Sequence, residues 1–242
     1  MKFSEEDIKS LNREFETSPP QDILAWASRN LGSSVALATS FQVQGMVLVD
    51  MFARTDPEAR IFTLDTGRLH SHTYDAMERT REKYDINIEV LFPDRTEVEE
   101  MVTSHGVNLF YKSVENRRLC CQIRKTNPLN GFLKTLDAWI TSIRADQTEQ
   151  RADSMKFEID YLHGKMLKIN PILDWTTDQV WDYIRKNDVP YNKLHDMGYP
   201  SIGCAPCTRA VEEGEDPRAG RWWWEQGSDK ECGIHFSHEP QS

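Results

Sequence analysis

Residues 33–55, "SSVALATSFQVQGMVLVDMFART", place a short apolar stretch, a turn and a longer apolar stretch in direct succession. Residues 33–40 predict a buried strand, and residues 44–55 predict a helix. The same order follows at once, because residues 59–66 read as a strand and residues 70–85 have helical periodicity. Strands that alternate with helices usually pair in parallel, so we predict an α/β fold with a mainly parallel sheet.

Further strands and helices are expected before and after residues 33–85. Further strands are expected at residues 86–93, 138–146 and 165–173. A last helix is expected near residues 174–187, where Thr176 and Gln179 fit a capping box. The N-terminal stretches "MKFSEEDIKSLNREFE" and "PPQDILAWASRNLG" both look helical.

The chain divides into three expected segments. Residues 1–30 form an N-terminal helical segment, and residues 31–187 form the α/β domain. From residue 188 the sequence becomes rich in turns, glycine, tryptophan and charge, so residues 188–242 are expected to form a C-terminal functional tail. Ligands of such sheets bind at the carboxyl ends of strands, where the turns "ATSFQVQG" and "LDTGRLH" lie.

Composition limits the classes of function. The formal net charge of −10 argues against broad nucleic-acid or membrane-surface binding, although a local basic pocket can still hold a small anion. The longest apolar run, residues 46–53, is too short to span a bilayer. The N-terminus lacks the apolar core of a signal peptide, so a cytoplasmic protein is expected.

Four of the five cysteines form two pairs. Cys120 and Cys121 are adjacent, whereas Cys204 and Cys207 form a CxxC motif. In a reducing compartment these thiols favour ligands or nucleophiles over disulfides. Three interpretations remain open, namely buried cysteines with a redox CxxC, a structural zinc site, and a [4Fe–4S] cluster. Adjacent cysteines favour the cluster, because its separate iron corners can each take a neighbouring thiolate.

The fifth cysteine lies alone near the C-terminus. Cys232 follows "GRWWWEQGSDKE", a polar stretch that contains glycine, and His235 comes three residues later. If the other four cysteines are ligands, Cys232 has no thiol partner and is a candidate nucleophile that His235 could tune. The alternatives are an inert small apolar residue and an exposed histidine.

Several long motifs together resemble the assimilatory adenylyl-sulfate (APS) reductase family, the iron–sulfur branch of the APS/PAPS reductases. The resemblance spans about residues 35 to 236, and the motifs occur in the order of the family. They are "LDTGRLH", "CCQIRK", "LDWTTDQVW", "YPSIGCAPCTR", "RAGRWWWE" and "KECGIH".

The resemblance implies a PP-loop fold with a doubly wound sheet, in which residues 31–187 are a nucleotide-binding reductase domain. It also implies that Cys232 attacks the sulfur of adenosine 5′-phosphosulfate and releases AMP. Thioredoxin or a similar dithiol would then free sulfite from the Cys–S–sulfonate. Because the chain ends at Ser242, shortly after Cys232, we expect this reductant to be a separate protein. A homo-oligomer is also expected from the family.

The resemblance further assigns roles to individual residues. The [4Fe–4S] ligands would be Cys120, Cys121, Cys204 and Cys207. Substrate would be bound by Ser40, Phe41, Leu64, Lys125, Arg144, Arg151, Arg218, Arg221 and His235. Among these, Lys125 is expected between cluster and substrate, and Leu64 near the adenine. Guanidinium groups suit phosphate and sulfate oxygens.

Other functions stay open at this stage. A relative of this type can use 3′-phosphoadenosine 5′-phosphosulfate (PAPS) alone or both substrates. A PP-loop tRNA thiolase also joins cysteines to an adenylating fold, but "TSFQVQG" lacks the tandem glycine and the aspartate of its loop. A zinc-stabilised binding module without catalysis would make Cys232 and the nearby arginines incidental.

Overall fold

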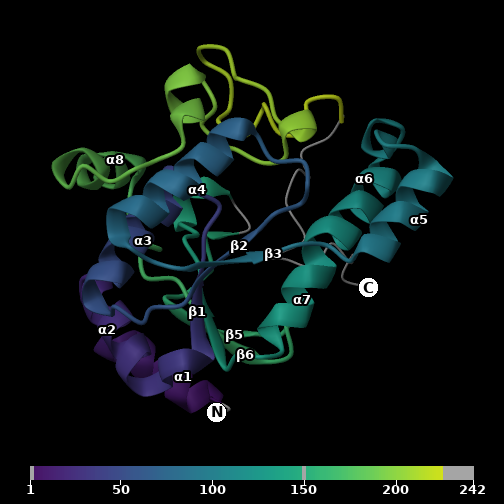
Figure 1. The fold of residues 1–242 in the computed structure, drawn as a ribbon. Helices are drawn as coiled ribbons and strands as arrows, with labels where there is room; N and C mark the ends of the chain where they lie inside the picture. Colours follow the sequence, from purple (N-terminus) through teal and green to yellow (C-terminus); the bar gives the residue numbers. More distant parts are fainter. Residues whose placement is uncertain (1–2, 149–150, 226–242) are drawn as a thin grey trace. The chain divides into compact units, whose positions relative to one another are not determined.

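The structure is a computed structural model that describes residues 3–148 and 151–225 (Figure 1). The chain divides into two compact units, each built from segments that are separate in the sequence. Unit 1 comprises Met1–Thr63, Asp75–Glu89 and Leu133–Asn192, and unit 2 comprises Leu64–Tyr74, Val90–Phe132 and Lys193–Ser242. The division of the chain at residues 30 and 187 stays a prediction.

A six-stranded sheet has the order β3-β2-β1-β4-β6-β5. Its strands are β1 Val35–Ala38, β2 Ile61–Leu64, β3 Ile88–Leu91, β4 Ala138–Ile140, β5 Phe157–Asp160 and β6 Met166–Ile169. β1 pairs in parallel with both β2 and β4, β4 pairs in parallel with β6, and β5 runs antiparallel to β6. The predicted α/β fold with a mainly parallel, doubly wound sheet is therefore confirmed.

Eight α-helices belong to the described part of the chain. They are α1 Glu5–Glu14, α2 Pro20–Leu31, α3 Val43–Thr55, α4 Ser71–Tyr84, α5 Arg95–His105, α6 Val114–Cys121, α7 Asn127–Leu133 and α8 Thr177–Lys186. The helices expected at residues 44–55, 70–85 and 174–187 are confirmed as α3, α4 and α8. The capping box is also confirmed, because the Thr176 hydroxyl accepts the Gln179 N–H and the Gln179 side chain accepts the Thr176 N–H.

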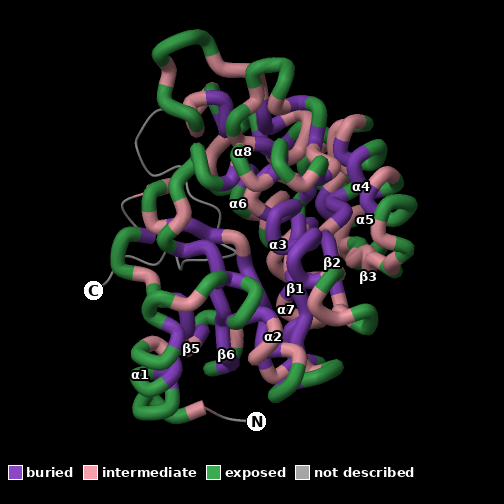
Figure 2. The backbone as a smooth tube through the Cα atoms, turned by 90° about the vertical axis from the view of Figure 1, so that its left-hand side faces the viewer, coloured by how far each residue is buried: buried purple, intermediate pink, exposed green. Residues whose placement is uncertain are grey.

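The core of unit 1 forms around α3. Residues 46–49 of this helix are fully buried, and α3 packs against α2 and α8. Figure 2 shows most of β1 and of α3 as buried. A strand and a helix that are buried along their length have few polar positions, which is why residues 33–55 were readable from the sequence.

Two parts of the fold were not predicted. The antiparallel strand β5 at the sheet edge was missed, and so were α5, α6 and α7 of residues 95–133. Met101 is the buried residue of α5, and Arg117 is the buried residue of α6. α6 lacks the apolar periodicity from which a helix is normally predicted, whereas α5 does repeat apolar residues at Val98, Met101 and Val102, a signal that was overlooked.

Among the described helices, none has both the length and the apolar character that a membrane span requires.

Candidate functional site

The carboxyl end of β1 is a turn that leads directly into α3. β1 lies between β2 and β4, so the strand order reverses here, and this reversal is where open α/β sheets bind ligands. Phe41 adopts a φ of 58°, and its N–H donates to the Thr39 hydroxyl at 3.2 Å. A Cβ added at Gly45 would lie 3.0 Å from Thr39 Oγ1, so glycine keeps this turn close to α3. Backbone N–H groups at such a helix start suit a phosphate.

The predicted residues of this turn differ in exposure. Ser40 is exposed, and its hydroxyl accepts a hydrogen bond from Gln42 Nε2 at 2.9 Å. Phe41 is fully buried, so its ring belongs to the core, and its carbonyl accepts the Asn192 N–H at 3.3 Å.

Two predicted arginines of unit 1 follow β4 and are almost fully buried. Arg144 is 6% exposed, pairs with Asp146 at 3.0 Å and donates to the Thr177 hydroxyl at 2.7 Å. Arg151 is 7% exposed and donates to the Gln147 side chain. Since Thr177 begins α8, Arg144 joins the carboxyl end of β4 to that helix.

The four paired cysteines meet in unit 2. They line one cavity of about 390 Å³, a volume that includes the solvent at its mouth. We call this the cysteine cavity; its lining residues are Arg68, Phe110, Arg117, Cys120, Cys121, Arg124, Lys125, Cys204, Pro206, Cys207, Arg221 and Trp222. The two cysteine pairs, which are far apart in the sequence, are therefore brought to one place.

Local structure sets the position of each pair. Cys120 and Cys121 form the last turn of α6, which continues through residues 122–126 into α7, with α5 beside this long helix (Figure 1). Cys204 and Cys207 frame a short 3₁₀ turn, η7 Ala205–Cys207, in which the Cys207 N–H donates to the Cys204 carbonyl at 2.9 Å. The Ala205 N–H donates to the Arg68 carbonyl at 2.8 Å, which ties this turn to the "LDTGRLH" loop.

The thiols lie in apolar surroundings. Cys207 is 8% exposed and packs with Met101, Leu109, Phe110 and Trp222. Burial raises the pKa of the Cys207 thiol to about 12 and also raises the pKa of Cys120. Thiols that resist ionisation, as Cys120 and Cys207 do, become stable thiolates when a metal centre replaces their protons.

Cations surround these sulfurs. The cysteine cavity is lined by Arg68, Arg117, Arg124, Lys125 and Arg221, and none of its described lining residues is acidic. The charges of Arg124 and Lys125 oppose the rise in the pKa of Cys120 that burial causes. This arrangement suits a centre with negative charge next to an anionic ligand.

Lys125 and Arg124 lie on a π-helix, η3 Gln122–Thr126, which follows α6 without a break. π-helical turns are rare and often occur at functional sites. Arg124 is 9% exposed and donates to the Thr66 carbonyl at 2.7 Å, and the Thr66 hydroxyl lies 3.2 Å from Cys204 Sγ. Thr66 thus connects the "LDTGRLH" loop to Cys204 directly and, through Arg124, to the π-helix that follows the first cysteine pair.

The two arginines before the tryptophans have different surroundings. Arg221 is 7% exposed, lines the cysteine cavity and donates to the Ser201 hydroxyl at 3.2 Å. A Cβ added at Gly203 would lie 2.6 Å from Arg221 Nη2, so glycine leaves the room that this guanidinium needs. Arg218 is partly buried in the preceding turn and is not among the residues that line the cavity.

The remaining predicted residues complete this account. Leu64 is the last residue of β2 and is partly buried. Cys232 and His235 lie outside the described residues. In residues 3–148 and 151–225, no three His, Cys, Asp or Glu side chains are arranged to hold a single metal ion.

Sequence reasoning missed several residues of the cavity. Arg68, Thr66 and Arg124 belong to the quoted motifs but received no role, and Arg117 received none either. Arg117 is 2% exposed and forms a bidentate ion pair with Glu225, with both N–O distances at 2.9 Å. Burial of a charge reflects its tertiary partner, which a single sequence does not display.

Comparison with known proteins shows the family. The model of the phosphoadenosine phosphosulfate reductase domain matches residues 34–210. The chain belongs to the APS/PAPS reductase family. It is 46% identical to adenosine 5′-phosphosulfate reductase of Burkholderia cepacia, over 84% of this chain and 81% of that protein. It is 45% identical to the protein of the same name from Allochromatium vinosum, over 88% and 83% of the two chains.

A solved structure of this reductase family has the same fold. The crystal structure of phosphoadenylyl-sulfate (PAPS) reductase from Candida auris, a phosphate complex, aligns with a TM-score of 0.75 at 29% identity. The alignment covers 87% of this chain and 99% of that chain. The motifs that indicated the family from sequence, such as "CCQIRK" and "YPSIGCAPCTR", form the cysteine cavity of unit 2.

Proposed function

We propose that this protein reduces adenosine 5′-phosphosulfate to sulfite and AMP, with Cys232 as the nucleophile. The observation that carries the proposal is the cysteine cavity, where four thiols and five cations meet in a chain of the APS/PAPS reductase family. Because all four thiols of the cavity bind the proposed cluster, Cys232 is the cysteine that remains for covalent chemistry. The relatives named adenosine 5′-phosphosulfate reductase support APS as the substrate.

The proposal includes a [4Fe–4S] cluster held by Cys120, Cys121, Cys204 and Cys207. Two features of the chain fit it: four buried or half-buried thiols around one cavity, and cations that can balance negative charge. A single zinc ion fits less well, because zinc ligands are usually spaced two to four residues apart and the adjacent Cys120 and Cys121 cannot easily direct both sulfurs at one small tetrahedral ion. When bound, the cluster supplies a fixed, compact charge next to the anionic substrate, and the reaction below draws no electron from it.

The chemistry balances with one nucleophile and one external dithiol. The Cys232 thiolate attacks the sulfur of APS, an S–S bond forms, and the bond between sulfur and the phosphate oxygen breaks as AMP leaves. A thiolate of the dithiol then attacks Cys232 Sγ and expels sulfite, which carries away the electron pair of the S–S bond. The second thiol of the dithiol resolves the mixed disulfide. Two electrons from the dithiol thus reduce sulfur and regenerate the Cys232 thiolate.

The chain's cations and turns provide the proposed binding groups. Lys125 and Arg221, on the wall of the cysteine cavity, neutralise the oxygens of the phosphosulfate, and Arg218 assists them. In unit 1, the turn that carries Ser40 and Phe41 binds phosphate or ribose, and Arg144 and Arg151 supply further anion contacts. Leu64 contacts the adenine, and His235 tunes the thiolate of Cys232.

The proposed electron donor and cellular compartment follow from the same thiol chemistry. Thioredoxin or a similar dithiol protein supplies the electrons, and a reducing compartment such as the cytoplasm keeps these thiols available. We also propose a homo-oligomer, which light scattering of the purified protein checks. PAPS remains the alternative substrate, and the rate of sulfite formation from APS and from PAPS with added thioredoxin compares the two.

The decisive experiment is a single turnover without reductant. Wild-type protein incubated with APS is expected to gain one sulfonate by mass, located on the peptide that contains Cys232. Cys232→Ser is expected to make no sulfite while it keeps its iron and its affinity for AMP, since serine cannot form the thiosulfonate. A sulfonate found on any other residue would overturn the assignment.

A further inference from the structure

Glu225, the last described residue, is held by a buried ion pair. Arg117 Nε and Nη2 each lie 2.9 Å from one carboxylate oxygen of Glu225, and the two side chains are 3% and 7% exposed. Arg117 belongs to α6, one turn before Cys120 and Cys121, and lines the cysteine cavity. The pair therefore connects the helix of the first cysteine pair to the point where the chain continues to Cys232.

A second set of contacts holds the turn just before Glu225. Trp222 has a φ of 44°, a conformation that bulky residues rarely adopt, yet its side chain is 1% exposed. The guanidinium carbons of Arg117 and Arg221 lie 4.5 Å and 4.8 Å from its ring centre. Its N–H donates to the Cys207 carbonyl at 3.1 Å, and its carbonyl accepts the Glu225 N–H at 2.9 Å. A strained backbone conformation of this kind persists only where several surrounding contacts hold it in place.

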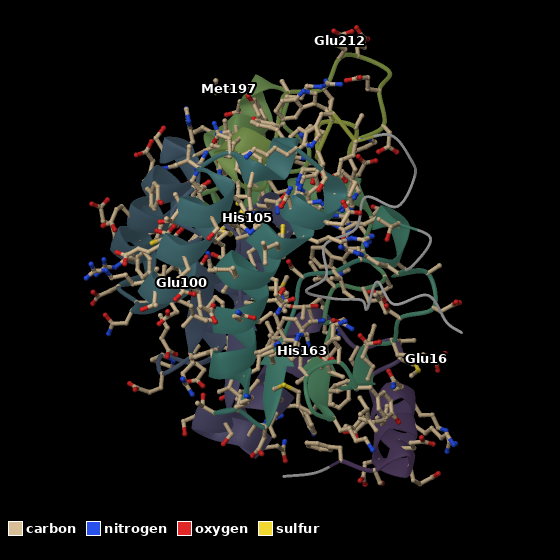
Figure 3. All side chains as sticks on the ribbon, turned by 90° about the vertical axis from the view of Figure 1, so that its right-hand side faces the viewer. Glu16, Glu100, His105, His163, Met197 and Glu212 are labelled. Carbon is tan, nitrogen blue, oxygen red and sulfur yellow. The ribbon has the colours of Figure 1, made fainter. Side chains whose placement is uncertain are left out.

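The same turn is joined to the second cysteine pair. Thr208 and Arg221 form an antiparallel bridge, and the Arg209 N–H donates to the Gly220 carbonyl at 3.0 Å. The loop between these two segments carries Glu212 at its outer end, as Figure 3 shows. The chain that leaves at Glu225 is thus fixed both to α6 and to the CxxC turn.

A buried ion pair adds little stability on average, because desolvation offsets most of the attraction. Its more specific effect here is geometric. Cys232 follows Glu225 by seven residues, so its Cα is within about 25 Å of the Cα of Glu225 when the chain is fully extended. The position of Glu225 therefore limits where the Cys232 sulfur can react.

We propose that Arg117 and Glu225 are positioning residues for the Cys232 nucleophile. Their ion pair fixes the origin of the C-terminal segment at the cysteine cavity, and this raises the effective concentration of the thiolate at the bound substrate. The effect is that of a short tether, which makes the attack intramolecular. The inference rests on the proposed function, because it assumes that Cys232 attacks a substrate bound beside the cavity.

The test measures the attack step alone. Under anaerobic conditions and without reductant, the single-turnover rate of Cys232 S-sulfonation by bound APS is compared between wild type and Glu225→Gln. Glutamine keeps the shape of the side chain but removes its charge, so the chain is then held from Trp222 and the tether to Cys232 lengthens from seven to ten residues. Effective concentration falls roughly as the −3/2 power of tether length, so we expect the rate to fall about twofold. Iron content and the dissociation constant of AMP are expected to stay unchanged, because neither depends on where the tail begins.

Glu89→Gln is the matched control. Glu89 accepts from Arg60 Nε at 2.9 Å and from Arg60 Nη2 at 3.0 Å, the same bidentate geometry within unit 1. This variant is expected to sulfonate at the wild-type rate. Arg117→Lys, which keeps the charge but loses the planar fork, is expected to slow sulfonation by less than Glu225→Gln does.

Alkylation by a small reagent distinguishes a change in the position of Cys232 from a change in the reactivity of its thiol. The rate at which iodoacetamide alkylates Cys232, followed on its peptide by mass, is expected to be the same in wild type and Glu225→Gln, because the reagent comes from solution. Slower alkylation in the variant, an unchanged sulfonation rate, or loss of iron from both Glu225→Gln and Arg117→Lys would each overturn the proposal. If wild type itself gains no sulfonate, the proposed function fails instead.

Discussion

At the scale of single residues, Lys125 is a cation whose charge acts on a cysteine of each pair. It lines the cysteine cavity, and its charge opposes the rise in the pKa values of Cys120 and Cys207 that burial causes. Its place on the π-helix directly after α6 makes its position depend on the same turn that carries the first cysteine pair. A charge so near the sulfurs can act on an anion in the cavity with little screening by water.

We therefore expect Lys125→Ala to lower kcat/KM for sulfite formation about 100-fold, the usual cost of losing one preorganised charged donor. Iron content is expected to remain, because Lys125 is not a ligand. Lys112→Ala is the control: this ammonium donates to the His105 carbonyl and is not among the residues that line the cavity, so its removal should leave activity unchanged. Complete loss of iron in Lys125→Ala would show that the lysine is structural.

At the scale of elements, unit 1 joins three helices through one buried carboxylate. Asp50 of α3 is fully buried and accepts hydrogen bonds from Tyr84 at the end of α4 and from Tyr183 of α8. Arg54, one turn later on α3, completes the network with a 2.9 Å contact to Asp50 Oδ1. Burial, together with the hydrogen bond to Asp50, raises the pKa of both tyrosines, so both hydroxyls remain donors. The network orients α4 and α8 against the buried helix α3.

Tyr183→Phe is expected to lower the free energy of unfolding by about 2 to 3 kcal/mol, as measured by urea denaturation. Among the described residues, Tyr183 alone donates to Asp50 Oδ2, so its loss leaves a buried oxygen of a charged group without a partner. Tyr84→Phe should cost less, since Oδ1 keeps both contacts from Arg54. Equal losses for the two variants would contradict this account.

At the scale of the whole molecule, the two units have different sources of stability. Unit 1 contains the buried strands β1, β4 and β6 and the core of α3. The apolar cluster of Met101, Leu109, Phe110 and Trp222 in unit 2 includes Cys207 itself. If the cysteines hold a metal centre, part of the stability of unit 2 is binding energy of that centre.

Anaerobically purified protein is expected to contain about four irons per chain. Removal of the iron by a chelator should increase amide hydrogen exchange in α6 and residues 204–208, because the sulfurs would lose the centre that joins them. Protection of β1 and β4 should persist. One zinc and no iron would instead support a zinc-stabilised module, and equal loss of protection in both units would contradict the separate role of the metal.

Local patterns determined a large part of this protein. The succession of strand, turn and helix in residues 33–55 predicted the α/β fold, because a strand and helix buried along their length have few polar positions. The capping box of Thr176 and Gln179 was readable because its partners are three residues apart. The motifs around Cys120 and Cys204 indicated the family, since each is a contiguous run of residues.

Tertiary structure alone decided which residues meet. The convergence of the two cysteine pairs, the cations around them and the pair of Arg117 with Glu225 all join segments that are distant in the sequence. The π-helix after α6 had no apolar periodicity to predict it. The physical reason is that a contact between distant segments depends on how the whole chain packs, whereas a single sequence displays only the preferences of neighbouring residues.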